Sequence, residues 1–173
     1  MTDISNNAAY IIKKINDIWG EKPGKKALQK TVFLIEQKGV DLGYDYGLHF
    51  YGPYSEALDT ATIFLSTDGV IEFDYSGRSH LMSINEKNFT IEPEKLTKKQ
   101  LDQIDALIEH FKGRSPSELE LLTTAIYAYK HLENKSRESV INGVQKIKGL
   151  KYPMEQIQRS LIDFEYFNLE FSA

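Results

Sequence analysis

Hydrophobic residues recur at helical spacing from the start of the chain. Residues 6–19 place Tyr10, Ile11, Ile15, Ile18 and Trp19 on one face. Positions three and four apart lie on the same side of an α-helix, so this spacing predicts a helix with one buried stripe. Gly20 is expected to end it.

A second helix is predicted over residues 25–36. Its expected buried side consists of Leu28, Val32, Phe33 and either Leu34 or Ile35, and Gly39 is a favourable residue just past its end. Its polar face is expected to carry Lys25, Lys26, Gln29 and Lys30.

The pattern changes to strands and turns after this helix. Residues 47–51 are aromatic-rich and bounded by glycines, which favours a strand, and Gly52 with Pro53 predicts a turn. A third helix is expected to open at Tyr54 or Ser55 and to end at Asp68 and Gly69. Residues 70–75 and 80–84, separated by a polar turn, predict a β-hairpin.

The order of helix, turn, helix and hairpin between residues 25 and 75 predicts a winged helix-turn-helix. The segment 85–96 is polar and is the expected boundary between two halves, residues 1–85 and 97–173. The second half is helical in pattern, with capping signatures at Thr97/Gln100 and Ser115/Glu118. Two further helices are expected over residues 137–148 and from Pro153 onward.

The predicted fold class is therefore mainly α with a small β-hairpin (α+β). A winged helix-like N-terminal half is expected to pack against a C-terminal helical bundle. Four amphipathic helices cannot bury their apolar faces in so small a segment alone, so we expect one continuous core.

Composition narrows the class of protein. The 173 residues are 41% hydrophobic and 27% charged, which is typical of globular proteins, and cysteine is absent, which excludes disulfides and thiol nucleophiles. No apolar run approaches the length of a membrane span, and the N-terminus does not resemble a signal peptide. We expect a cytoplasmic protein without a membrane partner.

Charge gives a mixed signal about nucleic acid. The formal net charge of −4 opposes DNA binding, but residues 13–38 contain seven lysines and three acids, a local balance of 7 − 3 = +4. This run is either the solvated face of two helices or a surface for a polyanion or an acidic partner.

Candidate chemistry is sparse. His49, His80, His110 and His131 are scattered without a metal-ligand spacing, and Asp41 and Asp45 lie in a loop where turn formation explains them. No catalytic constellation is evident, so we predict no enzyme activity, no cofactor and no metal.

Aromatic residues are densest between positions 44 and 54. Their rings belong either to the core edge or to a binding surface, and exposure beside the lysines would indicate a partner site. The predicted partner-binding residues are Lys22, Lys25, Lys26, Lys30, Tyr44, Tyr46, Tyr51 and Tyr54.

The third helix would enter the major groove in a winged-helix DNA complex. Its expected outward residues are Glu56, Asp59, Thr60, Thr62, Ser66 and Thr67, which include two acids and no Lys or Arg. Base readout and phosphate contact favour Arg, Lys, Asn and Gln, so this face opposes DNA binding.

Several short motifs occur together in one order. They are Leu28-Gln29-Lys30, then Tyr51-Gly52-Pro53-Tyr54-Ser55, then Gly69-Val70-Ile71, then Ser117-Glu118-Leu119-Glu120-Leu121-Leu122. In this the chain resembles the YwgA-type prokaryotic proteins over nearly its whole length and, more distantly, the Panacea or SocA-like antitoxin domain. The resemblance implies a regulator or a toxin-binding protein. The Ser115 to Leu132 helix departs from the antitoxin pattern, so that role rests on fold analogy.

Two hypotheses follow. The first is a non-catalytic regulatory or protein-interaction module that uses the aromatic loop and neighbouring lysines. The alternative is a DNA-binding transcriptional regulator, dimeric through its C-terminal helices, that contacts the phosphate backbone through Lys22, Lys25, Lys26, Lys30 and Arg78.

Overall fold

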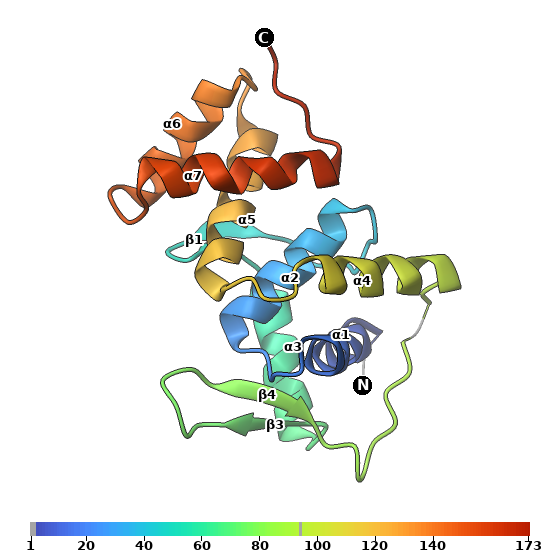
Figure 1. Ribbon diagram of the computed structural model, residues 1–173. Helices are drawn as coiled ribbons and strands as arrows, with labels where there is room; N and C mark the ends of the chain where they lie inside the picture. Colours follow the sequence, from blue (N-terminus) through green and yellow to red (C-terminus); the bar gives the residue numbers. More distant parts are fainter. Residues whose placement is uncertain (1–2, 94) are drawn as a thin grey trace.

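The chain folds into helices joined by two short antiparallel hairpins. The computed structural model describes residues 3–93 and 95–173, and Figure 1 shows its elements in order. The helices are α1 (Asp3–Trp19), α2 (Lys25–Gln37), α3 (Glu56–Thr67), α4 (Lys98–His110), α5 (Pro116–His131), α6 (Arg137–Lys148) and α7 (Met154–Ser160), and α7 continues as a 3₁₀ helix, Leu161–Phe167. The strands are β1 (Gly47–His49), β2 (Gly52–Tyr54), β3 (Ile71–Asp74) and β4 (Leu81–Ile84).

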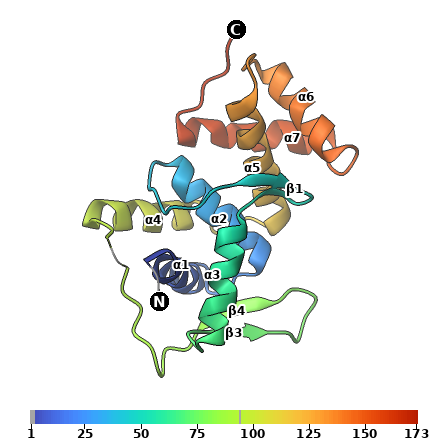
Figure 2. The same cartoon turned by 180° about the vertical axis from the view of Figure 1, so that it is seen from behind.

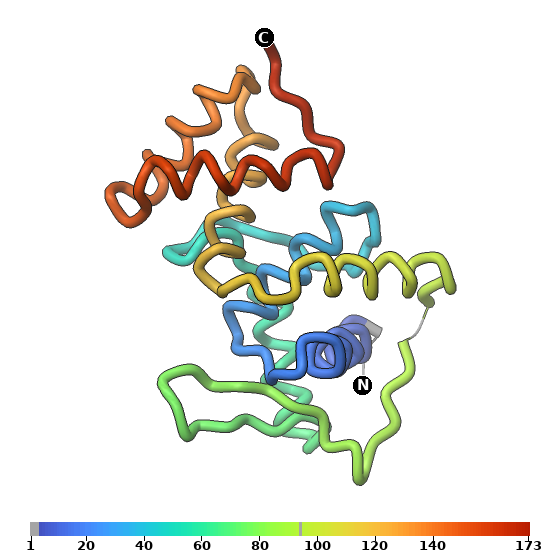
Figure 3. Tube along the Cα trace, viewed as in Figure 1, coloured from blue at the N-terminus to red at the C-terminus, as the bar shows by residue number. Residues whose placement is uncertain are grey.

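The elements lie along one long direction of the molecule. The β3–β4 hairpin is at one end, α6 and α7 are at the other, and α2 and α5 lie between them (Figure 1). From behind, α3 runs from the β1–β2 hairpin to the β3–β4 hairpin (Figure 2). The segment after β4 passes outside α1 towards α4 (Figure 3), and Asn6 of α1 donates a side-chain hydrogen bond to the carbonyl of Glu92 there.

Local sequence explains where the helices begin. Thr97 and Ser115 each cap the following helix and form the reciprocal pair with Gln100 and Glu118, so both predicted capping boxes are confirmed. Helix α3 was predicted to open at Tyr54 or Ser55. Ser55 is its N-cap, and the Ser55 side chain accepts a hydrogen bond from the amide of Leu58.

The turn between α2 and α3 differs from the prediction. Gly52 and Pro53 do not form the turn but belong to β2, which pairs with β1 so that His49 lies opposite Gly52. The chain turns at Phe50 and Tyr51 instead. Gly52 follows this turn directly and has φ +88°, a backbone conformation that glycine adopts readily.

The second hairpin contacts the connection between α1 and α2. In β3–β4, Ile71 lies opposite Ile84, and Leu81 makes an isolated antiparallel bridge with Gly24. The amide of Met82 donates to the carbonyl of Pro23 at 2.8 Å. This backbone pairing holds the hairpin against the start of α2.

One cluster of buried side chains runs through the molecule. It includes Ile11 of α1, Val32 of α2, Leu58 of α3, Ile104 of α4 and Ile126 of α5. Within the described residues, no helix is long and apolar enough to cross a bilayer.

Candidate functional site

Helix α5 is buried on almost every side. It packs against α2, α6, α7 and the β1–β2 hairpin, and its buried residues include Leu119, Leu122 and Ile126 together with the polar Thr123 and Thr124. A helix without a solvent-facing side has no place for an exposed charge. Glu120 lies in this helix, and its side chain is 0% exposed.

Three lysines and a tyrosine surround the Glu120 carboxylate. Nζ of Lys148, the last residue of α6, lies 2.7 Å from Oε1 of Glu120. Nζ of Lys151 lies 2.9 Å from both oxygens of the same carboxylate. Lys26 of α2 lies 2.9 Å from Oε2, and the hydroxyl of Tyr152 donates to the same oxygen. Four donor groups from three parts of the chain therefore converge on one carboxylate.

This arrangement fixes the charge of Glu120. Burial raises the pKa of its carboxyl, but the hydrogen bonds from Lys148, Tyr152, Lys26 and Lys151 outweigh burial and lower the pKa to about 2. One carboxylate and three ammonium groups leave a local charge of 3 − 1 = +2. The centre of the site is thus an ionised acid with an excess of positive charge around it.

Lys30 lies behind this cluster, and here the sequence prediction of an exposed residue is wrong. Its side chain is 1% exposed, and its ammonium donates to the carbonyl of Pro53 in β2. Burial, together with the nearby lysines, lowers the pKa of Lys30 to about 7, although Glu120 partly offsets this effect. Gln29, also predicted on the polar face, is buried and exchanges two hydrogen bonds with the backbone of Ser55.

The β1–β2 hairpin is fixed directly on α5. A Cβ on Gly52 would lie 2.7 Å from Oγ1 of Thr124, so only glycine permits this approach. Lys148 also donates to the carbonyl of Phe50 at 3.0 Å. The hairpin backbone is therefore held both by α5, which carries Glu120, and by Lys148 of α6.

The two side chains at this tip point outward. Phe50 is 81% exposed and Tyr51 is 55% exposed, while Lys151 lies 4.9 Å from the centre of the Tyr51 ring and Lys26 lies 5.2 Å from it. Aromatic rings attract ammonium groups at this distance. The exposed rings are thus placed next to the lysines that surround Glu120.

An open groove of about 610 Å³ lies between the hairpin and the C-terminal end of α6. Leu48, Phe50 and Tyr51 line one side, and Ile147, Lys148 and Lys151 line the other. Leu150 is fully exposed between the two lysines. We call this feature the hairpin groove.

The predicted aromatic surface divides in the structure. Tyr44 is buried and donates to the carbonyl of Ile4, and Tyr46 packs edge-on against Phe33 at the core. Tyr54 is half-buried and lies against the ring of His49. Of the four predicted tyrosines, Tyr51 alone projects beside the lysines, and Phe50 accompanies it.

The predicted lysine surface is also divided. Every lysine between positions 13 and 38 has a partner within the chain, so the run is not a free basic face. Lys22 pairs with Asp74, Lys25 with Asp59, Lys26 with Glu120, Lys13 with Asp17 and Glu86, and Lys14 with Asp105, while Lys30 and Lys38 donate to the carbonyls of Pro53 and Tyr166.

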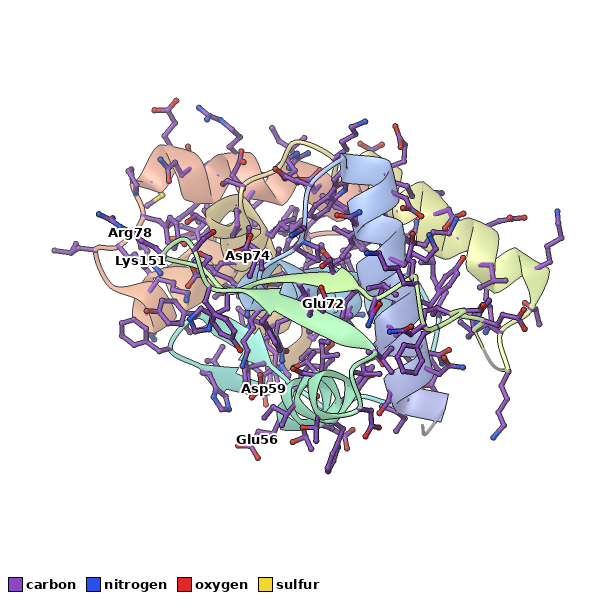
Figure 4. The ribbon with its side chains drawn as sticks, turned by 90° about the horizontal axis from the view of Figure 1, so that it is seen from below. Glu56, Asp59, Glu72, Asp74, Arg78 and Lys151 are labelled. Carbon is purple, nitrogen blue, oxygen red and sulfur yellow. The ribbon has the colours of Figure 1, made fainter. Side chains whose placement is uncertain are left out.

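The outward face of α3 carries acidic and apolar side chains. Its acidic residues are Glu56 and Asp59, and β3 adds Glu72 and Asp74 (Figure 4). Arg78 lies in the loop at the tip of the β3–β4 hairpin. Thr62 was expected on this face but is buried, with its hydroxyl donating to the carbonyl of Asp59. Ile63 and Phe64 are exposed in its place.

The other candidate ligands lie apart. Each histidine contacts a different aromatic ring, and within the described residues no three His, Asp or Glu side chains gather in a way that could hold a metal. Asp41 accepts from the amide of Gly43, as a turn-forming aspartate does.

The sequence analysis did not identify Glu120, Lys148, Lys151 or Tyr152. Glu120 carried a usable signal, because it lies in a helix whose neighbours are apolar or small on every side. Lys148 and Lys151 carried none, because their approach to Glu120 depends on how α6 folds back onto α5.

Comparison with known proteins adds no family. A scan against protein-family models finds no match, and a search of curated protein sequences finds none either.

Proposed function

We propose that this protein is a non-catalytic regulatory module that binds another protein through the hairpin groove. The observation that carries the proposal is the exposure of Phe50 and Tyr51 beside Lys26 and Lys151. Exposed apolar side chains that lie together mark interaction sites, and aromatic residues are enriched in interfaces. Fixed rings also lose little conformational freedom on binding.

The scaffold of the proposal is a winged helix with an inserted hairpin. The order of α1, α2 and α3 followed by β3–β4 supports it, as does the bridge between Gly24 and Leu81, which resembles the third strand of a winged-helix sheet. The β1–β2 hairpin lies where a winged helix has a turn. On this interpretation the insertion carries the partner site, in agreement with the antitoxin-like role implied by the resemblance.

Affinity purification from the native host tests the proposal. We expect the full chain, tagged and expressed at its natural level, to retain a protein partner, with the product of the adjoining gene as the first candidate. The F50A/Y51A double variant should lose that partner, because it removes both exposed rings. The Tyr75→Ala variant removes a ring that is 65% exposed near the other hairpin and should retain it.

Retention of the same partner by F50A/Y51A at the wild-type level would contradict the proposal. Thermal unfolding of each variant shows whether the loss reflects binding rather than folding.

DNA binding is the second candidate, supported by one feature. Lys22, Lys25, Lys26 and Arg78 line an open depression of about 600 Å³ at the start of α2. Three of these four side chains already pair with acids of the chain, and the α3 face beside them is acidic and apolar. A gel shift on genomic DNA at low and high salt tests this candidate, because binding to phosphates weakens steeply with salt. An absence of binding at low salt would eliminate it.

A further inference from the structure

We infer that the hairpin groove recognises an acidic side chain flanked by apolar residues in an exposed segment of the partner protein. The inference rests on the proposed function and specifies the chemistry of the partner. It combines the unbalanced charge around Glu120 with the apolar rim of the groove.

The charge excess favours an anion. Among the described residues, Glu120 is the one acid that pairs with Lys26, Lys148 and Lys151, and its two oxygens already accept hydrogen bonds from four groups. An ammonium has three protons to donate, and the contact with Glu120 uses one of those of Lys26 and two of those of Lys151. A second carboxylate reaching Lys26 and Lys151 would reduce the local charge from +2 to +1.

Two of the three lysines around Glu120 are accessible to a ligand from solvent. The side chains of Lys26 and Lys151 are 28% and 36% exposed, whereas that of Lys148 is 2% exposed. Lys26 and Lys151 bind the same carboxylate, so their ammonium groups lie close together. This geometry suits one anionic group and not the spaced phosphates of a nucleic-acid strand.

The rim of the groove favours apolar neighbours on either side of that anion. Phe50 and Leu48, both exposed, line the hairpin side, and the half-buried Ile147 lines the α6 side. A peptide segment with an acid between two apolar residues would cover these side chains while its carboxylate meets the lysines. Contacts of this kind combine an aromatic anchor with a charge-assisted hydrogen bond.

Panning of a phage-displayed random peptide library on the immobilised full-length protein tests the inference. We expect the enriched peptides to share an Asp or Glu next to Leu, Phe or Trp. One enriched sequence, synthesised with a fluorophore, then serves as the probe in anisotropy titrations. Its Glu-to-Gln or Asp-to-Asn version should bind at least about tenfold more weakly, because a charge-assisted hydrogen bond is lost.

Matched variants locate the binding to the groove. K151Q and F50A should each weaken the probe at least about tenfold, one through the charge and the other through the aromatic anchor. K146Q changes an exposed lysine of α6 outside the groove, and Y75A removes an exposed ring at the other hairpin, so both should bind within about twofold of wild type. F50A does not touch Glu120, so its result is independent of any effect of K151Q on folding.

Three results would overturn the inference. They are an enriched motif without an acid, a probe indifferent to K151Q and F50A, and a single-stranded oligonucleotide that binds the groove more tightly than the probe. Self-association of the wild-type protein that F50A abolishes would also overturn the inference, because the groove would then bind a second copy of the chain. If the enriched motif lacks an acid but a co-purified partner is lost in F50A/Y51A, the inference about an acidic segment fails while the proposed protein-binding function stands. The two claims can thus be tested separately.

Discussion

Buried ionisable side chains in this protein differ in how their charge is compensated. Glu120 has several cationic neighbours, and its pKa falls to about 2. Lys30 has one carbonyl partner, and burial lowers its pKa to about 7. Glu36 accepts backbone hydrogen bonds from Leu42 and Tyr44, but burial outweighs them and raises its pKa to about 7. The balance between burial and partners therefore decides each state.

Glu120→Gln tests the central ion cluster. We expect it to lower the free energy of unfolding by about 3–5 kcal/mol, because removing one partner of a buried pair leaves the other charges uncompensated. Glu155→Gln is the matched control, since Glu155 forms an exposed pair with Arg159, and it should cost less than about 1 kcal/mol. Urea unfolding of the two variants gives both values. Equal small losses would contradict the buried cluster.

Lys30→Met tests the depressed pKa. Between pH 7 and 10.5 the unfolded chain holds a proton on Lys30 that the folded chain has released, so the free energy of unfolding rises with pH in this window. From pH 7.5 to 9.5 the rise from this group reaches about 2 kcal/mol, at about 1.4 kcal/mol per pH unit. Urea unfolding of Lys30→Met should show this rise removed, whereas Lys146→Met should keep it. The same slope in wild type and Lys30→Met would refute the assignment.

Glu36 acts in a different pH window. Between pH 4.5 and 7 the folded chain holds a proton on Glu36 that the unfolded chain has lost, so stability from this group falls as pH rises. The combined contribution of Glu36 and Lys30 to the free energy of unfolding is therefore smallest near pH 7.

At the residue scale, sequence predicted the apolar core better than the charged site. Leu28, Val32 and Phe33 are buried as predicted, because spacing alone decides which face of a helix is apolar. Lys30 was placed on the surface because burial of an ammonium is costly without a partner. Its partner is a carbonyl brought in by β2, and helical periodicity contains no information about that contact.

At the scale of elements, the β1–β2 hairpin is the unexpected feature. It replaces the predicted turn at Gly52-Pro53 and carries the exposed rings of the proposed site. The strand predicted over residues 47–51 is confirmed in part by β1, but β2 falls on Gly52 and Pro53, which are typical turn residues and have no strand pattern. The capping boxes of α4 and α5 are local and were recognisable.

Gly52→Ala tests how tightly this hairpin is fixed. The added methyl group would meet Oγ1 of Thr124 at 2.7 Å, and φ of +88° is unfavourable for alanine. We expect a loss of about 1–3 kcal/mol in the free energy of unfolding, measured by urea titration. Gly77→Ala, in the turn of the other hairpin, meets no atom within 4 Å and should have little effect. A tolerated Gly52→Ala would show that the hairpin is free to shift, against the proposed rigid site.

At the scale of the whole molecule, long-range polar contacts join the two halves of the chain. Trp19 donates to the carbonyl of Ile108, Lys38 donates to the carbonyl of Tyr166, and Lys26 pairs with Glu120. These contacts connect α1 and α2 to the C-terminal helices. Two of them also engage lysines that composition alone presented as a basic surface, and the pair with Glu120 compensates the charge of Lys26.

Unfolding should therefore be one transition. The division into residues 1–85 and 97–173 with a continuous core predicts that Trp19 fluorescence and far-ultraviolet circular dichroism report the same midpoint in urea. Two separated transitions would contradict a continuous core.

Site-specific photo-crosslinking in the native host tests the partner site most directly. A full-length chain with Phe50→p-benzoylphenylalanine should form a covalent adduct with one partner protein on irradiation, because the hairpin tip contacts it. The same photoreactive residue at Tyr75, a ring that is 65% exposed near the other hairpin, should not form that adduct. An adduct from position 75 and none from position 50 would contradict the assignment of the hairpin groove as the binding surface.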